Sequence, residues 1–207
     1  MRMRVIACGA LATELRAVLD VAGLRDAVDV TYLPAHLHNR PERIVPEVTA
    51  ALDRVDGVDG FGDPEPTLVA YADCGTGGHL DALLDTRPGT TRLPGAHCYE
   101  MFAGHHEFAR LSEEEPGTFF LTDFLARHFR ALVWEGLGLD RHPELATMYF
   151  GNYRRVVLLT QSDDPAVVTA GRDAARQLDL TFEHRHVGRA GLATAVSVAL
   201  APRQRVA

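Results

Sequence analysis

The chain has 207 residues, of which 46% are hydrophobic and 24% are charged, and its formal net charge is −7. This length and composition are typical of a soluble globular protein with one large domain or two small ones. The negative charge argues against nucleic-acid binding, which requires a basic surface. All 21 basic residues are arginine, so a Schiff-base lysine and a P-loop lysine are both excluded.

No stretch of the sequence is as long and apolar as a membrane span, which needs roughly 18 residues. The N-terminus runs directly into the apolar segment Met3–Cys8, without the pattern of a cleaved signal peptide. Three cysteines, an odd number, fit a reducing compartment better than a set of disulfides. We therefore expect a cytoplasmic protein that binds neither membranes nor nucleic acid.

Short apolar runs and segments of helical periodicity alternate along the chain. The expected strands cover Arg4–Cys8, Val28–Leu33, Thr67–Ala72, Thr90–Leu93, Phe119–Leu121, Arg155–Thr160 and Leu180–His184. The expected helices cover Leu11–Val21, Pro41–Val55, His79–Leu84, Cys98–Leu111, Asp123–Glu135, Pro165–Leu178 and Ala190–Leu200. This alternation predicts an α/β fold whose largely parallel sheet carries helices on both faces.

The organisation of the chain is expected to be simple, with residues 1–207 forming a single α/β domain. Residues from about 94 to 153 are rich in expected helices and predict a cap over the edge of the sheet. Two local signals support the helix boundaries. Pro41 suits the first turn of a helix, and Thr122 can cap the helix that follows it.

Each of the three cysteines follows an expected strand. Cys8 ends the first strand, Cys74 follows the third, and Cys98 lies beyond the fourth. In an open parallel sheet the carboxyl ends of the strands share one edge, where ligands bind. A lone cysteine is often a small buried hydrophobic residue, but the joint pattern predicts that Cys8, Cys74 and Cys98 meet.

Three converging thiols indicate a metal site. Three protein ligands with a free fourth position are typical of catalytic zinc. An iron–sulfur cluster in which one iron lacks a protein ligand fits equally well. No Cys-x-x-Cys motif decides between the two cofactors, and zinc bound by two cysteines and a histidine is a further alternative.

Two histidines are candidates for proton transfer. His38 lies in the expected loop after the second strand, beside the first strand, and is a candidate ligand or proton donor. His97 adjoins Cys98, and neighbouring side chains usually point in different directions, so His97 is a candidate acid–base group rather than a ligand. The alternative is that both are ordinary surface histidines without a functional role.

The segment Asp73–Gly78 reads Asp-Cys-Gly-Thr-Gly-Gly and follows a strand. Its successive backbone amides could hold an anionic group of a cofactor or substrate, with Gly75, Thr76 and Gly77 as the binding residues. The spacing matches neither a dinucleotide-binding motif nor a P-loop, and no Gly-x-Ser-x-Gly elbow occurs.

Several of these segments together resemble the domain-of-unknown-function family 1638. They are Ala7–Leu11, Leu33–Pro41, Tyr71–Gly77, His97–Gly104 and Pro116–Thr122. The resemblance supports treating the three cysteines as one set, although the family pattern has an aspartate between the residues that are His97 and Cys98 here. It implies a metal-linked or corrinoid-linked role, with a corrinoid or a methyltransferase as a partner.

Three hypotheses of function follow from these observations. The first is a metal-dependent enzyme that binds a small anionic, thiol or amine substrate at the open metal position. The second is a non-enzymatic accessory protein that binds a metal or corrinoid or delivers it to a methyl-transfer enzyme. The third is a metal-free hydrolase or transferase that uses Cys74 or Cys98 as its nucleophile.

Overall fold

The computed structural model describes residues 3–56 and 66–200. Its strands form two parallel sheets, one in each of two compact units. Unit 1 comprises Met1–Met101 and Gly191–Ala207, and unit 2 comprises Phe102–Ala190. The predicted α/β class and parallel pairing are confirmed. The sequence predicts one sheet, whereas the described strands form two, because the fourth and fifth strands do not pair.

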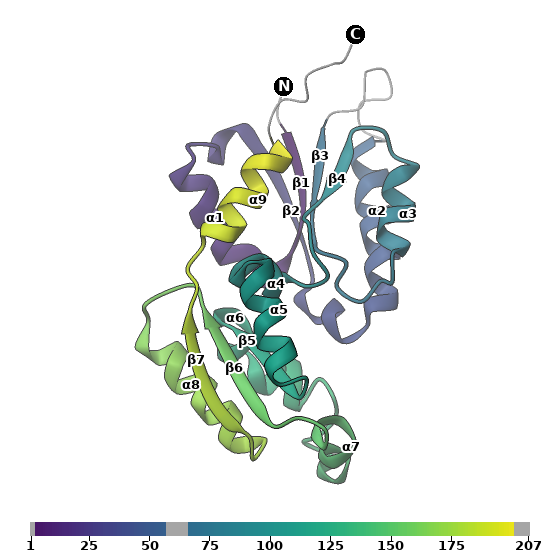
Figure 1. Cartoon of the computed structure of the whole chain (residues 1–207). Coiled ribbons are helices and arrows are strands. Elements are labelled where there is room, and N and C mark those ends of the chain that lie inside the picture. Colours follow the sequence, from purple (N-terminus) through teal and green to yellow (C-terminus); the bar gives the residue numbers. More distant parts are fainter. Residues whose placement is uncertain (1–2, 57–65, 201–207) are drawn as a thin grey trace. The chain divides into compact units, whose positions relative to one another are not determined.

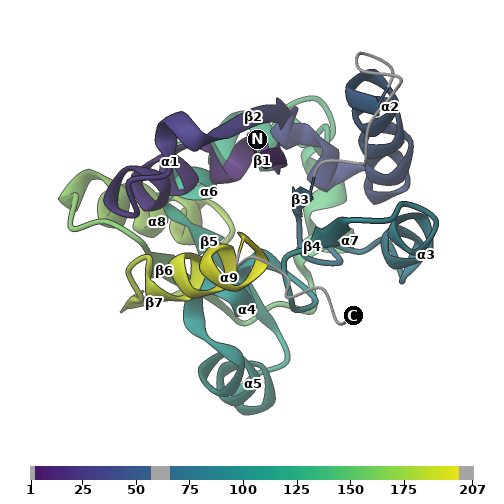
Figure 2. The same ribbon diagram turned by 90° about the horizontal axis from the view of Figure 1, so that it is seen from above.

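Unit 1 is built on a sheet with the strand order β2-β1-β3-β4. Its elements are β1 (Met3–Cys8), α1 (Ala12–Val21), β2 (Val28–Leu33), α2 (Ile44–Asp56), β3 (Thr67–Ala70), α3 (His79–Asp85), β4 (Thr90–Arg92), α4 (Cys98–Ala103) and α9 (Ala190–Leu200). Helices α2 and α3 lie on one face of the sheet, and α1 and α9 lie on the other (Figures 1 and 2).

The apolar runs of the sequence explain the order of this sheet. Strand β3 is buried along its whole length, and the last four residues of β1 are also buried. Such continuous burial is typical of parallel strands that are covered by helices on both faces. The register pairs Cys8 with Leu33 and Ala7 with Ala70, so the carboxyl ends of β1, β2 and β3 lie at one edge.

Unit 2 is built on a smaller sheet with the strand order β5-β6-β7. Its elements are α5 (His105–Glu114), β5 (Thr118–Thr122), α6 (Asp123–Arg127), a π-helical turn (Arg130–Trp134), α7 (Ala146–Phe150), β6 (Arg155–Thr160), α8 (Pro165–Gln177) and β7 (Thr181–His186). As the sequence predicts, the Thr122 hydroxyl caps α6 by accepting a hydrogen bond from the Leu125 amide.

The segment expected as a cap mostly belongs to unit 2. It supplies β5 and part of that unit's hydrophobic core, including Leu121, Phe129 and Phe150. The helix expected over residues 98–111 is divided between α4 and α5 at Gly104, whose φ of 81° does not continue a helix. Local periodicity is continuous across this point, which is why the sequence predicts one helix.

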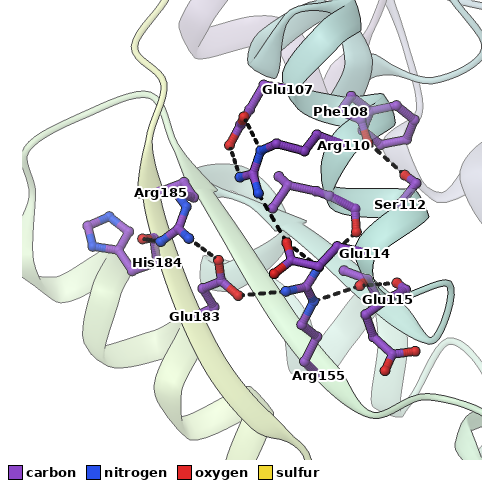
Figure 3. A network of polar contacts seen from close by, with 12 residues as sticks. Glu107, Phe108, Arg110, Ser112, Glu114, Glu115, Arg155, Glu183, His184 and Arg185 are labelled. Carbon is purple, nitrogen blue, oxygen red and sulfur yellow. Dashed lines mark hydrogen bonds and ion pairs between the residues drawn. The ribbon is translucent and has the colours of Figure 1, made fainter.

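A polar network links α5 to the sheet of unit 2 (Figure 3). Arg155 on β6 donates hydrogen bonds to the Glu183 carboxylate at 2.9 Å, to the Thr118 hydroxyl at 2.9 Å and to the Leu111 carbonyl at 2.7 Å. The Arg155 side chain is only 12% exposed, and these bonds compensate for its burial. The network therefore has a structural explanation.

Among the helices in the described ranges, none has both the length and the apolar character needed to cross a membrane.

A substitution at Gly9, beside Cys8, tests how closely β1 and β2 approach each other at the edge of the sheet. A Cβ atom at this position would lie 2.8 Å from the Leu33 carbonyl oxygen, at the end of the neighbouring strand. We expect Gly9→Ala to force β1 and β2 apart and to lower the free energy of unfolding by about 1–3 kcal/mol. Urea denaturation measures the change. Unchanged or increased stability would contradict the close approach described.

Candidate functional site

Four strand ends in unit 1 bring the predicted residues together. Cys8 is the last residue of β1, and His38 lies in the 3₁₀ segment Ala35–Asn39 that follows β2. Cys74 follows β3, and Cys98 is the first residue of α4, beyond β4. The Nδ1 atom of His38 lies 3.6 Å from the Cys8 Sγ atom, and the thiols of all three cysteines act on the pKa of His38. The three cysteines and His38 therefore share one region of the sheet edge.

The His38 ring is oriented by backbone as well as by sulfur. Its Nδ1 atom lies 3.1 Å from the Ala35 carbonyl oxygen and 3.6 Å from the Cys8 Sγ atom. A carbonyl oxygen only accepts hydrogen bonds, so we assign the hydrogen to Nδ1. In the neutral ring Nε2 then carries the lone pair, as in histidines that bind metals through Nε2.

Charge balance also explains the state of His38. Burial opposes a positive charge on the ring, but interactions in which the ring can donate to the sulfur atoms of Cys74, Cys8 and Cys98 outweigh burial and raise the pKa of His38 above its ordinary value. These interactions favour a positive charge on the ring where the neighbouring thiols are ionised.

The Cys8 side chain is oriented by a backbone amide and by His38. Its sulfur accepts a hydrogen bond from the Ala10 amide at 3.4 Å, so it caps the 3₁₀ segment Gly9–Leu11. The residue is 2% exposed, and its sulfur lies 3.6 Å from the Nδ1 atom of His38.

Cys74 has a strained backbone. Its φ of 51° lies in the left-handed region, which is uncommon for a residue other than glycine. Such strain persists where the surroundings hold the residue in place, and it is concentrated at functional sites. The Cys74 amide donates a hydrogen bond to the Ala96 carbonyl at 2.8 Å, which holds the loop.

The glycine-rich turn after Cys74 uses its donors internally. The Asp73 carboxylate accepts hydrogen bonds from the Thr76 hydroxyl at 2.7 Å, the Gly78 amide at 2.9 Å and the Gly77 amide at 3.1 Å. These bonds hold the pKa of Asp73 below its usual value. An anion at the predicted Gly75, Thr76 and Gly77 site would have to displace the Asp73 carboxylate from these donors.

The loop that carries Cys98 is fastened to the Cys74 loop and to α3. The Asp73 amide donates to the Gly95 carbonyl at 3.1 Å. Arg92 forms a two-pronged ion pair with Asp81 on α3, at 2.5 and 2.8 Å, and also donates to the carbonyls of Leu93 and Gly95. These contacts fix the start of the chain segment that leads to Cys98.

The Cys98 thiol is less ready to ionise than an exposed thiol. Burial raises the pKa of Cys98, and the hydrogen bond to His38 opposes this effect only in part. The residue retains some exposed surface, whereas Cys8 and Cys74 are buried. The exposed part of Cys98 is therefore not its thiol, whose burial disfavours the ionised form.

His97, the second predicted proton carrier, has a different environment. Its side chain is exposed, and its ring packs against Tyr99 with the ring centres 6.3 Å apart. Its carbonyl accepts a hydrogen bond from the Glu100 amide at 3.1 Å, at the start of α4. His38, and not His97, is therefore the histidine described beside the cysteines. A role of His97 in proton transfer remains a prediction.

Tyr71 is a member of the site that the sequence analysis misses. It directly follows β3, is 1% exposed, and its hydroxyl is buried without a hydrogen-bond partner. Burial and the negative charge of Cys8 raise the pKa of Tyr71 above its usual value. The only signal in the sequence is its position three residues before Cys74, because tyrosine is common in strands.

The proximity of the three thiols does not by itself form the coordination sphere of a metal. Within residues 3–56 and 66–200, no group of three or more histidine, cysteine, aspartate and glutamate side chains is arranged to hold a metal ion as it stands. The three thiols are close enough to act on one another and on the pKa of His38. Binding a common ion would require them to draw in around it, so their role as metal ligands remains a prediction.

The chain belongs to the family described as protein of unknown function (DUF1638), whose model matches residues 32–196. His38, Tyr71, Cys74 and Cys98 lie inside the matched range, and Cys8 lies before it. No curated protein and no solved structure gives a significant match. Family membership therefore confirms the resemblance seen in the sequence and assigns no activity.

The left-handed backbone of Cys74 leads to a test with two substitutions. Glycine adopts a positive φ without the steric cost of a Cβ atom, whereas alanine bears that cost. In metal-free protein we expect Cys74→Gly to be more stable than Cys74→Ala by about 0.5–1 kcal/mol. Urea denaturation of both variants gives the difference, and a more stable alanine variant would contradict the described backbone.

The Arg92–Asp81 pair leads to a pH-dependent test. The bond to Arg92 lowers the pKa of Asp81. Its stabilising contribution is therefore fully present above the unfolded pKa of about 3.9 and is lost as the pH falls through the lower folded value. Because the Asp81 side chain is 51% exposed, we expect Asp81→Asn to cost only roughly 0.5–1 kcal/mol at pH 7.

Denaturation of the wild type and Asp81→Asn over a range of pH values measures this contribution. The two stabilities should converge as the pH falls below the lowered pKa of folded Asp81, where the carboxylate is protonated in both folded and unfolded protein. A difference that stays constant down to that pH would show that the ion pair does not hold this loop.

Proposed function

We propose that the protein is a cytoplasmic metal-binding protein in which Cys8, Cys74 and Cys98 hold one zinc ion or one iron–sulfur cluster. The open position of the metal would bind a small anionic, thiol or amine substrate. His38 would move protons at that position. The strongest support is that Cys8, His38 and Cys74 follow neighbouring parallel strands at one sheet edge, with the Nδ1 atom of His38 3.6 Å from the Cys8 sulfur.

The charge state of His38 supports a cation at this point. Three buried thiols can ionise together only beside compensating positive charge. In the metal-free protein the proton on His38 supplies part of that charge. A bound cation would take over this role, so metal binding would release the His38 proton along with the thiol protons. After losing this proton, the neutral imidazole of His38 could act as a base beside the metal.

The donor set fits both candidate cofactors. Thiolates bind zinc at about 2.3 Å in tetrahedral sites, and a site with three protein ligands keeps one position open. Three cysteines also suit a cluster in which one iron lacks a protein ligand. Either cofactor, when bound, would supply a Lewis acid for the substrate. The hydrogen bond from Nδ1 to Ala35 favours His38 acting through Nε2, either as a base or as a further ligand.

A metal-free cysteine nucleophile is the second candidate function. The specific observation in its favour is the pair of Cys8 and His38, with Sγ 3.6 Å from Nδ1. The Ala10 amide also donates a hydrogen bond to this sulfur, and a cysteine beside a histidine is a common nucleophile–base pair. This pair differs from the prediction of Cys74 or Cys98 as the nucleophile, because Cys8 is the thiol with the described amide donor.

The metal hypothesis is tested by purifying the full chain without oxygen and measuring zinc, iron and the visible absorption spectrum. We expect close to one zinc ion, or the iron of one cluster, per chain. Cys8→Ala, Cys74→Ala and Cys98→Ala should each lower the metal content severalfold, because the three thiols act as one set.

Matched histidine variants separate the site from the surrounding loop. His36 and His38 lie in the same 3₁₀ segment, but the His36 side chain is exposed. We expect His38→Ala to change the pH dependence of metal binding and His36→Ala to leave it unchanged. Wild-type protein without zinc or iron would contradict the proposal. Transfer of the metal to a methyl-transfer enzyme, without turnover, would favour the accessory role instead.

A further inference from the structure

A pair of histidines lies in unit 2, at the end of its edge strand β7. His184 and His186 are two residues apart on this strand, so their side chains point to the same face of the sheet. The His184 ring lies on the side of β7 away from the polar network around Arg155 (Figure 3). Both histidines are exposed, so packing in a hydrophobic core does not explain them.

The two imidazoles converge on one hydroxyl group of the neighbouring strand. The register pairs His186 with Thr160, the last residue of β6. The Thr160 Oγ1 atom lies 2.9 Å from Nε2 of His184 and 3.3 Å from Nδ1 of His186. Thr160 is fully buried, which fixes the position of its hydroxyl. Parallel pairing thus brings two nitrogen atoms of the kind that bind metals to one point at the carboxyl edge of this sheet.

A carboxylate adjoins the two imidazoles. Asp163 lies in the loop after β6, and its Oδ1 atom is 3.5 Å from Nδ1 of His186. Atoms that each lie about 2.1 Å from a common ion are roughly 3–3.5 Å apart, which is the spacing between neighbouring atoms of this group. As they stand, the three described side chains do not enclose an ion. The Asp163 side chain is 97% exposed, so it is free to turn toward the imidazoles.

We propose that His184, His186 and Asp163 bind a zinc ion at the end of β7. Two imidazoles and one carboxylate are a donor set that zinc uses in proteins, and the absence of a thiolate from the set leaves imidazole as its main donor. The site is separate from the proposed cysteine site, whose residues all belong to unit 1, and it does not rest on that proposal.

A bound ion would hold the end of β7 in place. Val187 and Gly188 directly follow this strand, and their amides donate hydrogen bonds to the Thr160 carbonyl at 2.9 and 3.1 Å. Strand β7 pairs only with β6 among the described strands, so its end opens by separating from that one neighbour. Zinc held by both β7 and the loop after β6 would bind the paired form in preference to the open form, which makes opening rarer.

Hydrogen exchange of the full chain, followed by NMR with and without zinc, tests the site. A zinc titration of the same signals gives the dissociation constant. At a zinc concentration about ten times this constant, the exchange of the Val187 and Gly188 amides should slow about tenfold. In His184→Ala and His186→Ala, zinc should leave these rates unchanged. Each variant is compared with its own metal-free form, so the loss of the bond to Thr160 does not enter the comparison.

His142→Ala is the matched control. His142 is also an exposed histidine of unit 2, and its Nδ1 atom lies 3.2 Å from the Glu144 carboxylate. It therefore pairs one imidazole with one carboxylate outside β7. Its removal should preserve the effect of zinc on Val187 and Gly188. Asp163→Asn should weaken zinc binding severalfold, because an amide oxygen without charge replaces a carboxylate.

The outcomes are distinct from those of the cysteine site. Exchange rates at Val187 and Gly188 that do not respond to zinc in the wild type would overturn the proposed site on β7. A zinc effect that persists in both His184→Ala and His186→Ala would also overturn it, because the ion would then act from elsewhere. Zinc bound by the cysteines changes the signals of Cys8 and Cys74 instead, so each proposal can fail without the other.

Discussion

The position of Cys8, His38 and Cys74 at one edge of the sheet depends on the parallel pairing of β2, β1, β3 and β4. Because all four strands run in the same direction, residues that are far apart in the sequence reach one edge of the sheet. Thiols gathered in a buried place repel one another once ionised, and the proton on His38 offsets this repulsion. The fold of unit 1 therefore also determines which charges meet at this sheet edge.

The loops around the cluster are braced in ways that this constraint explains. Cys74 keeps a left-handed backbone, and Asp73 ties the following turn together through three hydrogen bonds. Arg92 joins the segment before Cys98 to α3. Backbone strain and many hydrogen bonds in the loops around a group of reactive side chains are typical of a binding site. There, the precise placement of the side chains takes precedence over stability.

The sequence predicts much of this site because buried parallel strands have a clear local pattern. The apolar runs that end at Cys8 and precede Cys74 locate the two central strands, and the loop position of His38 follows from them. The sequence misses Tyr71, since an aromatic residue at a strand end looks like an ordinary core residue. It also predicts one sheet instead of two, because which strands pair depends on contacts distant in sequence, and it misses the break at Gly104, where the helical periodicity continues.

The central claim is that the three sulfur atoms share one metal centre. X-ray absorption at the K-edge of the metal bound to the full chain tests it most directly, because it identifies the atoms in the first shell. The account predicts protein sulfur neighbours at about 2.3 Å, and fewer of them in each single cysteine variant. A first shell of oxygen and nitrogen alone would contradict it.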